Sequence, residues 1–137
     1  MTVADRIRDE EGWRPHVYSD SLGFATIGYG FLIDSRRGEG LPKEVADFWL
    51  ASEIAKTERS LTDWWMPFLS QPPDVRDALT EMAFQLGVDG VLGFHTMLAA
   101  LERGDRASAA TAALDSKWHN QTPARAERVT SLLRGST

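Results

Sequence analysis

The stretch that decides the fold is Asp9–Gly30, DEEGWRPHVYSDSLGFATIGYG. It opens with three consecutive acidic residues at the end of an amphipathic segment, and a further acid, Asp20, follows nine residues after Glu11. Small, aromatic and β-branched residues then lead through Thr26 to a run of glycines. This change of pattern predicts a helix followed by a small antiparallel hairpin or sheet.

The three acids at the helix end are not equivalent. The preceding segment predicts a helix that begins at a Thr2 cap, with Asp5 three residues later, and is ended by Gly12. Its apolar stripe lies at Val3 and Ile7. On a helical wheel Glu10 and Glu11 lie near this stripe, whereas Asp9 lies off it. The wheel therefore excludes Asp9 and leaves Glu10 and Glu11 open. Acids at a helix C-terminus interact unfavourably with the helix dipole and so lower the stability of the helix. Residues that are locally unfavourable for stability often belong to functional sites. The simpler alternative is that these acids are solvated at the helix end.

A second carboxylate close by raises the prospect of acid–base chemistry. Asp20 alone is typical of a turn, because its side chain accepts hydrogen bonds from nearby backbone amides. Together with an acid on the helix it suits glycoside hydrolysis, which needs one protonated and one ionised carboxyl group. A helix end and a sheet turn offer the two different surroundings that separate their pKa values.

Prolines and capping residues predict the remaining helices. These are a long helix from Pro42 to about Leu61, a helix capped by Asp74 and stopped by Gly87, an alanine-rich helix capped by Asp105, and a last helix from the Thr122-Pro123 cap to about Arg134. The pattern predicts an α+β fold in one domain. A small β-containing lobe takes up about residues 13–60, and a helical lobe takes up about residues 61–137 plus the helix at 1–11. The long helix joins them, with a cleft between the lobes.

Composition narrows the class of protein. The 137 residues are 42% apolar and 26% charged, and the net charge of −5 argues against nucleic-acid binding. The absence of cysteine excludes disulfides and thiolate metal sites. His16, His95 and His119 lack metal-ligand spacing, so we expect neither metal nor cofactor. Charges from Asp5 onward do not fit a signal peptide, and we expect synthesis in a cytoplasm.

Three blocks resemble the T4-type phage lysozymes, glycoside hydrolase family 24. The N-terminal block comprises Glu11-Gly12, Tyr18, Asp20, Gly23 and the sequence TIGYG at 26–30. The second is MAFQLGVDGVLGF at 82–94, and the third is KWHNQTPARAERV at 117–129. Three ordered blocks spread over nearly the whole chain are far more specific than one short motif.

The resemblance implies a muramidase that hydrolyses the β-1,4 bond between N-acetylmuramic acid and N-acetylglucosamine in peptidoglycan, with inversion. It gives Glu11 the general-acid role, Asp20 the role of base or electrostatic partner, and Thr26 a part in placing the attacking water. It implies a monomeric endolysin that lyses the host. Such an enzyme reaches the periplasmic cell wall through a holin-type pore.

The resemblance also implies further site residues. Arg125 would pair with Glu11 and hold its orientation. Leu32, Phe84 and Gln85 would line the saccharide cleft, although plain core packing is the alternative for Leu32 and Phe84. Gln85 is more informative, because an amide on a buried side needs a partner.

The sequence departs from the family at Phe31, where a histidine is usual, and at Met97 and Ala112, where relatives carry polar cleft residues. Three alternatives remain. A lytic transglycosylase needs no second carboxylate, so Asp20 and Thr26 argue against it. A non-catalytic peptidoglycan-binding module would not need the acids at all. A tail-associated, wall-piercing role would use the same chemistry at another stage of infection.

Overall fold

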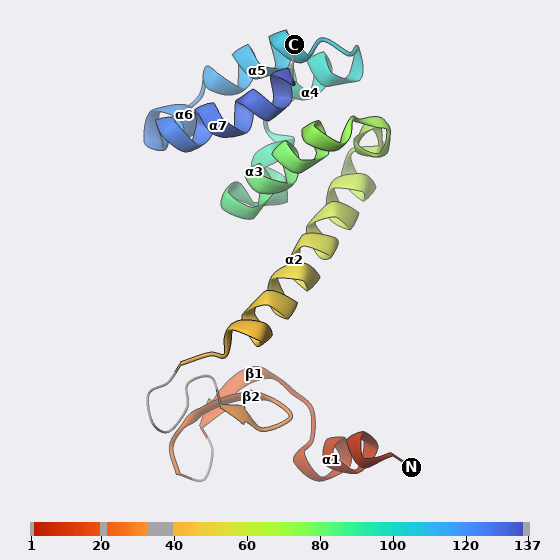
Figure 1. The fold of residues 1–137 in the computed structure, drawn as a ribbon, viewed down its shortest axis with the longest axis vertical. Coiled ribbons are helices and arrows are strands. Elements are labelled where there is room, and N and C mark those ends of the chain that lie inside the picture. The colour runs from red at the N-terminus through yellow and green to blue at the C-terminus, as the bar shows by residue number, and fades with distance from the viewer. Residues whose placement is uncertain (1, 20–21, 33–39, 136–137) are drawn as a thin grey trace. The chain divides into compact units, whose positions relative to one another are not determined.

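The computed structural model describes residues 2–19, 22–32 and 40–135. Contacts between Cα atoms divide the chain into two compact units, residues 1–50 and 51–137 (Figure 1). The first contains a three-stranded antiparallel sheet, and the second is helical. The predicted α+β class is confirmed. The predicted lobe boundaries and the predicted cleft between lobes stay predictions.

Helix α1 spans Val3–Glu11 and begins at a capping box. The Asp5 amide donates to the Thr2 hydroxyl over 3.1 Å, and the Thr2 amide donates to the Asp5 carboxylate over 2.9 Å. The Thr2 amide and the Thr2 hydroxyl, which lies 2.7 Å from Asp5 Oδ2, both donate to the Asp5 carboxylate and hold its pKa below the usual value. Gly12, with φ of 70°, ends the helix, so both predicted ends are confirmed. The Ile7 side chain of the predicted apolar stripe is 51% exposed.

The sheet places Thr26 on its central strand. Its strands are β1 (Arg14–Ser19), β2 (Ala25–Gly28) and β3 (Phe31–Leu32), in the order β1-β2-β3. Thr26 faces Tyr18 across one ladder and Leu32 across the other. The predicted change from helix to antiparallel strands is therefore confirmed, and the register makes Leu32 a direct neighbour of Thr26.

Helix α2 spans Lys43–Trp64, and the short 3₁₀ helix η1 follows at Met66–Ser70. The predicted long helix is confirmed and runs three residues further than expected. The boundary between the two units falls within α2. Two of its apolar side chains, Val45 and Trp49, are exposed.

Helix α3 spans Pro73–Leu92 and is interrupted at Gly87, whose φ of 79° and ψ of 159° are not helical. The predicted break at Gly87 is confirmed as a kink. The predicted cap at Asp74 is wrong: Pro72 occupies the N-cap position and makes no side-chain bond. Asp74 lies inside the first turn instead, and its carboxylate accepts hydrogen bonds from Arg106 and the Val75 amide.

Four further helices complete the second unit: α4 (His95–Glu102), α5 (Arg106–Leu114), α6 (Lys117–Gln121) and α7 (Pro123–Arg134). The predicted Asp105 cap is confirmed, since its carboxylate accepts bonds from the Ser108 amide and hydroxyl at 3.1 and 2.7 Å. Thr122 stands at the N-cap of α7 but makes no side-chain cap bond. Its hydroxyl donates to the Trp118 carbonyl instead.

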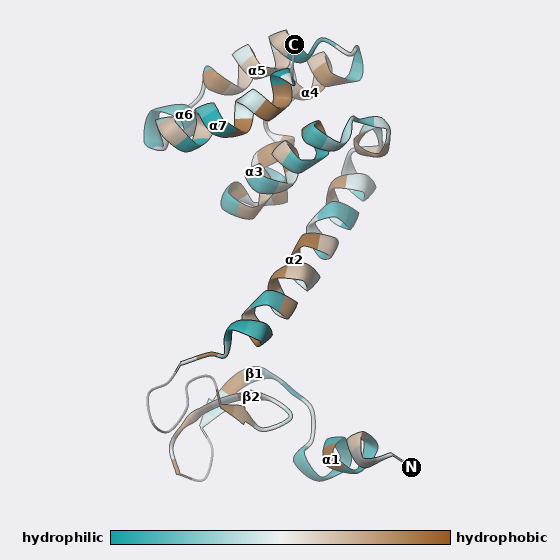
Figure 2. Ribbon diagram, in the orientation of Figure 1, coloured by the Kyte–Doolittle hydropathy of each residue, from teal (hydrophilic) through white to brown (hydrophobic). Residues whose placement is uncertain are grey.

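The hydrophobic core of the described residues belongs to the helical unit. Every buried hydrophobic side chain among them lies between Leu61 and Leu133. Hydrophilic and hydrophobic residues alternate along the helices that enclose this core (Figure 2). Within the described ranges, no single helix is long and apolar enough to cross a membrane, and α3 with α4 meets that test only as a pair bent by 92°.

Candidate active site

Glu11 lies where α1 ends, and its side chain packs against the turn between β2 and β3. A Cβ atom placed on Gly30 would lie 2.8 Å from Glu11 Oε2 and 3.4 Å from its Cδ. Gly30 has a φ of 82°, in the left-handed region that L-residues rarely adopt. The carboxyl group therefore occupies space that any other residue at position 30 would fill.

Thr26 is the most enclosed candidate residue. Its side chain is only 1% exposed, and its hydroxyl donates to the Phe24 carbonyl over 2.9 Å. Because the hydroxyl proton is used in this bond, the Thr26 oxygen is left as a hydrogen-bond acceptor. Leu32, its partner across the ladder to β3, is half-buried.

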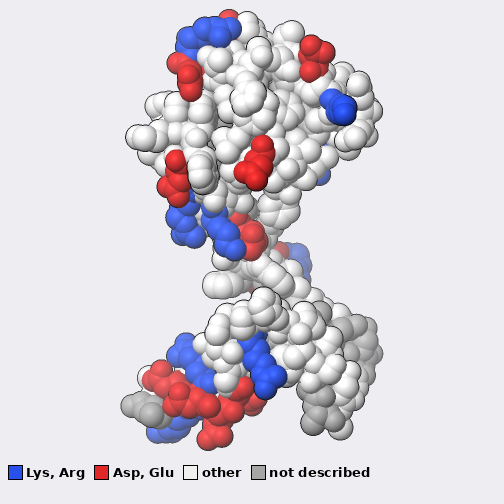
Figure 3. Space-filling model, turned by 180° about the vertical axis from the view of Figure 1, so that it is seen from behind, with Lys and Arg blue, Asp and Glu red and all other residues white. Residues whose placement is uncertain are grey.

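Asp20 lies outside the described residues, so its separation from Glu11 stays a prediction. Asp9, Glu10 and Glu11 are all exposed on α1. Figure 3 shows Asp and Glu side chains gathered on this helix, with Lys and Arg side chains beside them. Exposure alone therefore does not separate Glu11 from its neighbours, whereas the contact with Gly30 belongs to Glu11.

Aromatic side chains surround the same glycine turn. The rings of Trp13 and Tyr29 lie 5.4 Å apart at their centroids. Phe31, the residue at the usual histidine position, is 63% exposed, and its ring lies 3.2 Å from where a Cβ on Gly28 would be. The departure at Phe31 thus adds apolar surface beside the turn that carries Gly30.

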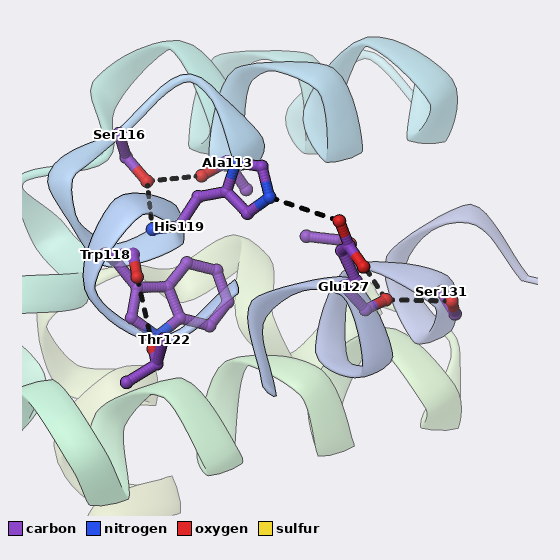
Figure 4. Close-up of polar contacts among 8 residues, drawn as sticks. Ala113, Ser116, Trp118, His119, Thr122, Glu127 and Ser131 are labelled. Carbon is purple, nitrogen blue, oxygen red and sulfur yellow. Dashed lines mark hydrogen bonds and ion pairs between the residues drawn. The ribbon is translucent and has the colours of Figure 1, made fainter. Parts of the chain in front are cut away.

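Gln85 joins three elements of the helical unit. Its amide oxygen accepts from Trp118 Nε1 over 3.0 Å, and its amide nitrogen lies 3.4 Å from the Thr122 hydroxyl. That hydroxyl donates to the Trp118 carbonyl (Figure 4). The partner that the Gln85 amide needs is therefore found within the chain. Phe84, its neighbour on α3, is 54% exposed, and a substrate role for either residue stays a prediction.

An open groove of about 500 Å³ lies in the helical unit beside these residues. Its lining includes the apolar side chains of Phe94, Met97, Ala112 and Trp118. Met97 and Ala112, the two positions that the sequence marked as departures from the family, therefore lie in the same groove. His95, Asp115 and Lys117 also line it. The sequence did not single out Asp115 and Lys117, although Lys117 opens the third block.

Arg125 lies exposed in the first turn of α7. It belongs to the second unit and Glu11 to the first, so the predicted pair of Arg125 with Glu11 stays a prediction. On the same helix Glu127 Oε1 lies 3.3 Å from His119 Nε2, a contact that links α6 to α7 (Figure 4). Among the residues described, no cluster of three or more His, Asp or Glu side chains could hold a metal ion.

The profile of the phage lysozyme family matches residues 8–134 of the chain. This range contains the glycine turn with Glu11, the groove and all three sequence blocks. The chain therefore belongs to the phage lysozyme family of glycoside hydrolases. The resemblance read from the three blocks is confirmed.

The chain is similar to part of one phage spike protein and to almost the whole length of two T4-type lysozymes. The chain is 32% identical to the pre-baseplate central spike protein of Enterobacteria phage T4, with an alignment that covers 97% of this chain and 28% of that protein. It is 26% and 24% identical to the probable T4-type lysozymes 1 and 2 of Dictyostelium discoideum. Both of those alignments cover 99% of this chain and 95% of the relative.

Proposed function

We propose that the protein is a muramidase that hydrolyses the β-1,4 bond between N-acetylmuramic acid and N-acetylglucosamine in peptidoglycan. The observation that carries this proposal is the family match over residues 8–134, which includes Glu11, Asp20 and Thr26. The relatives named T4-type lysozymes support it, since they align over almost their whole length.

In this proposal Glu11 is the general acid. Its proton passes to the glycosidic oxygen as the bond from that oxygen to the muramic acid C1 breaks. Water attacks C1 from the opposite face, and the ionised Asp20 takes the proton that the water loses. The anomeric centre is inverted, which requires room for water between two carboxyl groups about 6.5–9.5 Å apart.

Thr26 places the water. Since its hydroxyl proton is donated to the Phe24 carbonyl, the Thr26 oxygen accepts one hydrogen of the attacking water. That bond orients the water without removing its nucleophilic lone pair. Arg125 orients the Glu11 carboxyl, and Leu32, Phe84 and Gln85 contact the glycan.

The biological role that we propose is endolysin. The enzyme is made in the host cytoplasm, acts as a monomer and reaches the periplasmic wall when a holin-type pore opens the inner membrane. Lysis of the host cell follows from loss of the glycan strands.

A tail-associated role is the second candidate, and the alignment with the T4 central spike protein favours it. The two roles use the same reaction and differ in location. Quantitative mass spectrometry of purified virions separates them: stoichiometric presence in the particle supports the tail role, and absence from the particle supports the endolysin.

The decisive experiment compares wall clearing by wild type, Glu11→Gln and Glu10→Gln. Glu10 is an exposed acid on the same helix, so its substitution removes the same charge next to the site. We expect clearing by wild type and Glu10→Gln and loss of clearing in Glu11→Gln. Equal activity in all three would remove Glu11 as the acid, and no activity in any would favour a binding module.

Product analysis tests the reaction type. A hydrolase leaves reducing muramic acid ends, whereas a lytic transglycosylase leaves anhydro-muramic ends. Mass spectra of digested peptidoglycan are therefore expected to show reducing ends, and anhydro ends would replace the hydrolase with the transglycosylase.

A further inference from the structure

The contact between Glu11 and Gly30 has a direct chemical meaning for the proposed acid. Glu11 Oε2 would lie 2.8 Å from a Cβ at position 30, closer than nonbonded carbon and oxygen atoms normally approach. No other described glycine has a carboxylate oxygen near its missing side chain. The glycine thus leaves a space that the Glu11 carboxyl group fills.

We propose that Gly30 is a positioning residue for Glu11, a role that rests on the proposed function. Its lack of a side chain lets the carboxyl group lie against the turn that follows β2, the strand that carries Thr26. The turn thereby fixes the acid relative to the residue that places the water. Gly30 itself takes no part in proton transfer.

Substitution at position 30 moves the acid more than it disturbs the fold. The colliding atom is the free end of a flexible side chain, so rotation of Glu11 relieves the contact. A displacement of about 1 Å of a catalytic group can lower the rate about 100-fold. The expected signature of Gly30→Ala is therefore a loss of turnover in a folded protein that still binds its substrate.

Backbone strain must be separated from this effect, because alanine at a positive φ is itself unfavourable. Gly104 provides a matched control, since its φ of 77° is close to the 82° of Gly30 and a Cβ there meets nothing within 4 Å. Gly30→Asn provides a second variant, since asparagine tolerates positive φ better than alanine and carries the same Cβ.

The first test measures turnover and wall binding of wild type, Gly30→Ala, Gly30→Asn and Gly104→Ala on purified peptidoglycan, with folding checked by circular dichroism. We expect turnover about 100-fold lower in both Gly30 variants, with wall binding kept, and near-normal turnover in Gly104→Ala. Normal turnover in the Gly30 variants would overturn the proposal. Loss of wall binding would also overturn it, because Gly30 would then contact the glycan directly.

The second test needs no activity and so separates this proposal from the proposed function. Carbon-13 label in the glutamate carboxyl groups gives a Glu11 signal, which is assigned by its absence in Glu11→Gln. We expect this signal to shift in Gly30→Ala and Gly30→Asn and to stay in place in Gly104→Ala. An unchanged Glu11 signal in the Gly30 variants would overturn the positioning role, even if the wild type clears walls.

Discussion

Arg106 Nη2 lies 2.7 Å from Asp74 Oδ2, so an ion pair joins the beginning of α5 to the first turn of α3. The same guanidinium donates to the Leu133 carbonyl over 2.7 Å and to the Leu132 carbonyl over 2.8 Å. These two carbonyls belong to the last turn of α7, where helical partners are missing. One side chain therefore satisfies groups on two helices besides its own.

Replacement of Arg106 by methionine should destabilise the helical unit. A hydrogen bond that involves a charged group contributes roughly 1.5–3 kcal/mol, and Arg106 makes two such bonds to carbonyls in addition to the ion pair. We expect a fall in Tm of several degrees by circular dichroism. Arg103→Met is the control, because Arg103 is exposed and its contact to Asp105 is 3.7 Å long. A Tm equal to that of the control would contradict the role of Arg106.

The stability contributed by Asp74 should depend on pH. The hydrogen bond from Arg106 lowers the pKa of Asp74 in the folded protein relative to the unfolded chain. Such a carboxylate contributes stability above the unfolded pKa, and the contribution is lost as pH falls through the folded pKa. We expect Asp74→Asn to melt below wild type at neutral pH and the gap to close in strong acid. A gap of constant size down to the lowest pH would contradict this linkage.

Gly135 should contribute to stability, because a side chain at this position would collide with the Arg106 guanidinium. A Cβ there would lie 2.6–2.8 Å from Arg106 side-chain atoms, which their acceptors hold in place. Gly104 has the same φ of 77° and open space around its missing side chain. We expect Gly104→Ala to cost about 1–2 kcal/mol from strain and Gly135→Ala to cost more. Chemical denaturation measures both, and equal costs would show that the guanidinium contact is unimportant.

Gln85 should stabilise the fold whether or not it touches substrate. Its amide oxygen accepts from the indole of Trp118, which is 4% exposed. In Gln85→Leu this donor is left buried without a partner, which costs about 1–3 kcal/mol. Gln85→Glu keeps the acceptor and should cost less, and Asn120→Ala, on the exposed surface of α6, is the control. Urea unfolding, monitored by tryptophan fluorescence, measures the free energy of unfolding of each variant. Equal free energies for Gln85→Leu and Asn120→Ala would contradict a stabilising role of Gln85.

Local signals predicted the ends of several helices well. The Thr2 and Asp105 caps, and the break at Gly87, depend on residues a few positions apart. The predicted cap at Asp74 is wrong, because its carboxylate binds Arg106, a residue 32 positions away that no local pattern reveals. The Thr122 hydroxyl is likewise diverted from capping to contacts with Trp118 and Gln85.

At the candidate site, too, local patterns predicted some features, whereas others depend on contacts between distant residues. Spacing and chemistry drew attention to Glu11, and the wheel could not separate it from Glu10. In the structure Glu11 differs from Glu10 by its contact with Gly30. That contact depends on the position of the β2–β3 turn, which the sequence pattern located only approximately. The sequence predicted that the Gln85 amide needs a hydrogen-bond partner but not which residue supplies it, since Trp118 lies 33 positions away.

The placement of the core has a consequence for how the protein loses function on heating. Among the described residues, the buried hydrophobic side chains begin at Leu61, whereas Glu11 and Thr26 belong to the sheet-bearing unit. Regions with few buried apolar contacts open at lower free energy than the core. We therefore expect the unit that carries the proposed acid Glu11 and the proposed water-placing residue Thr26 to open first, so that heat inactivation precedes the melting of the helices that dominate the far-ultraviolet signal.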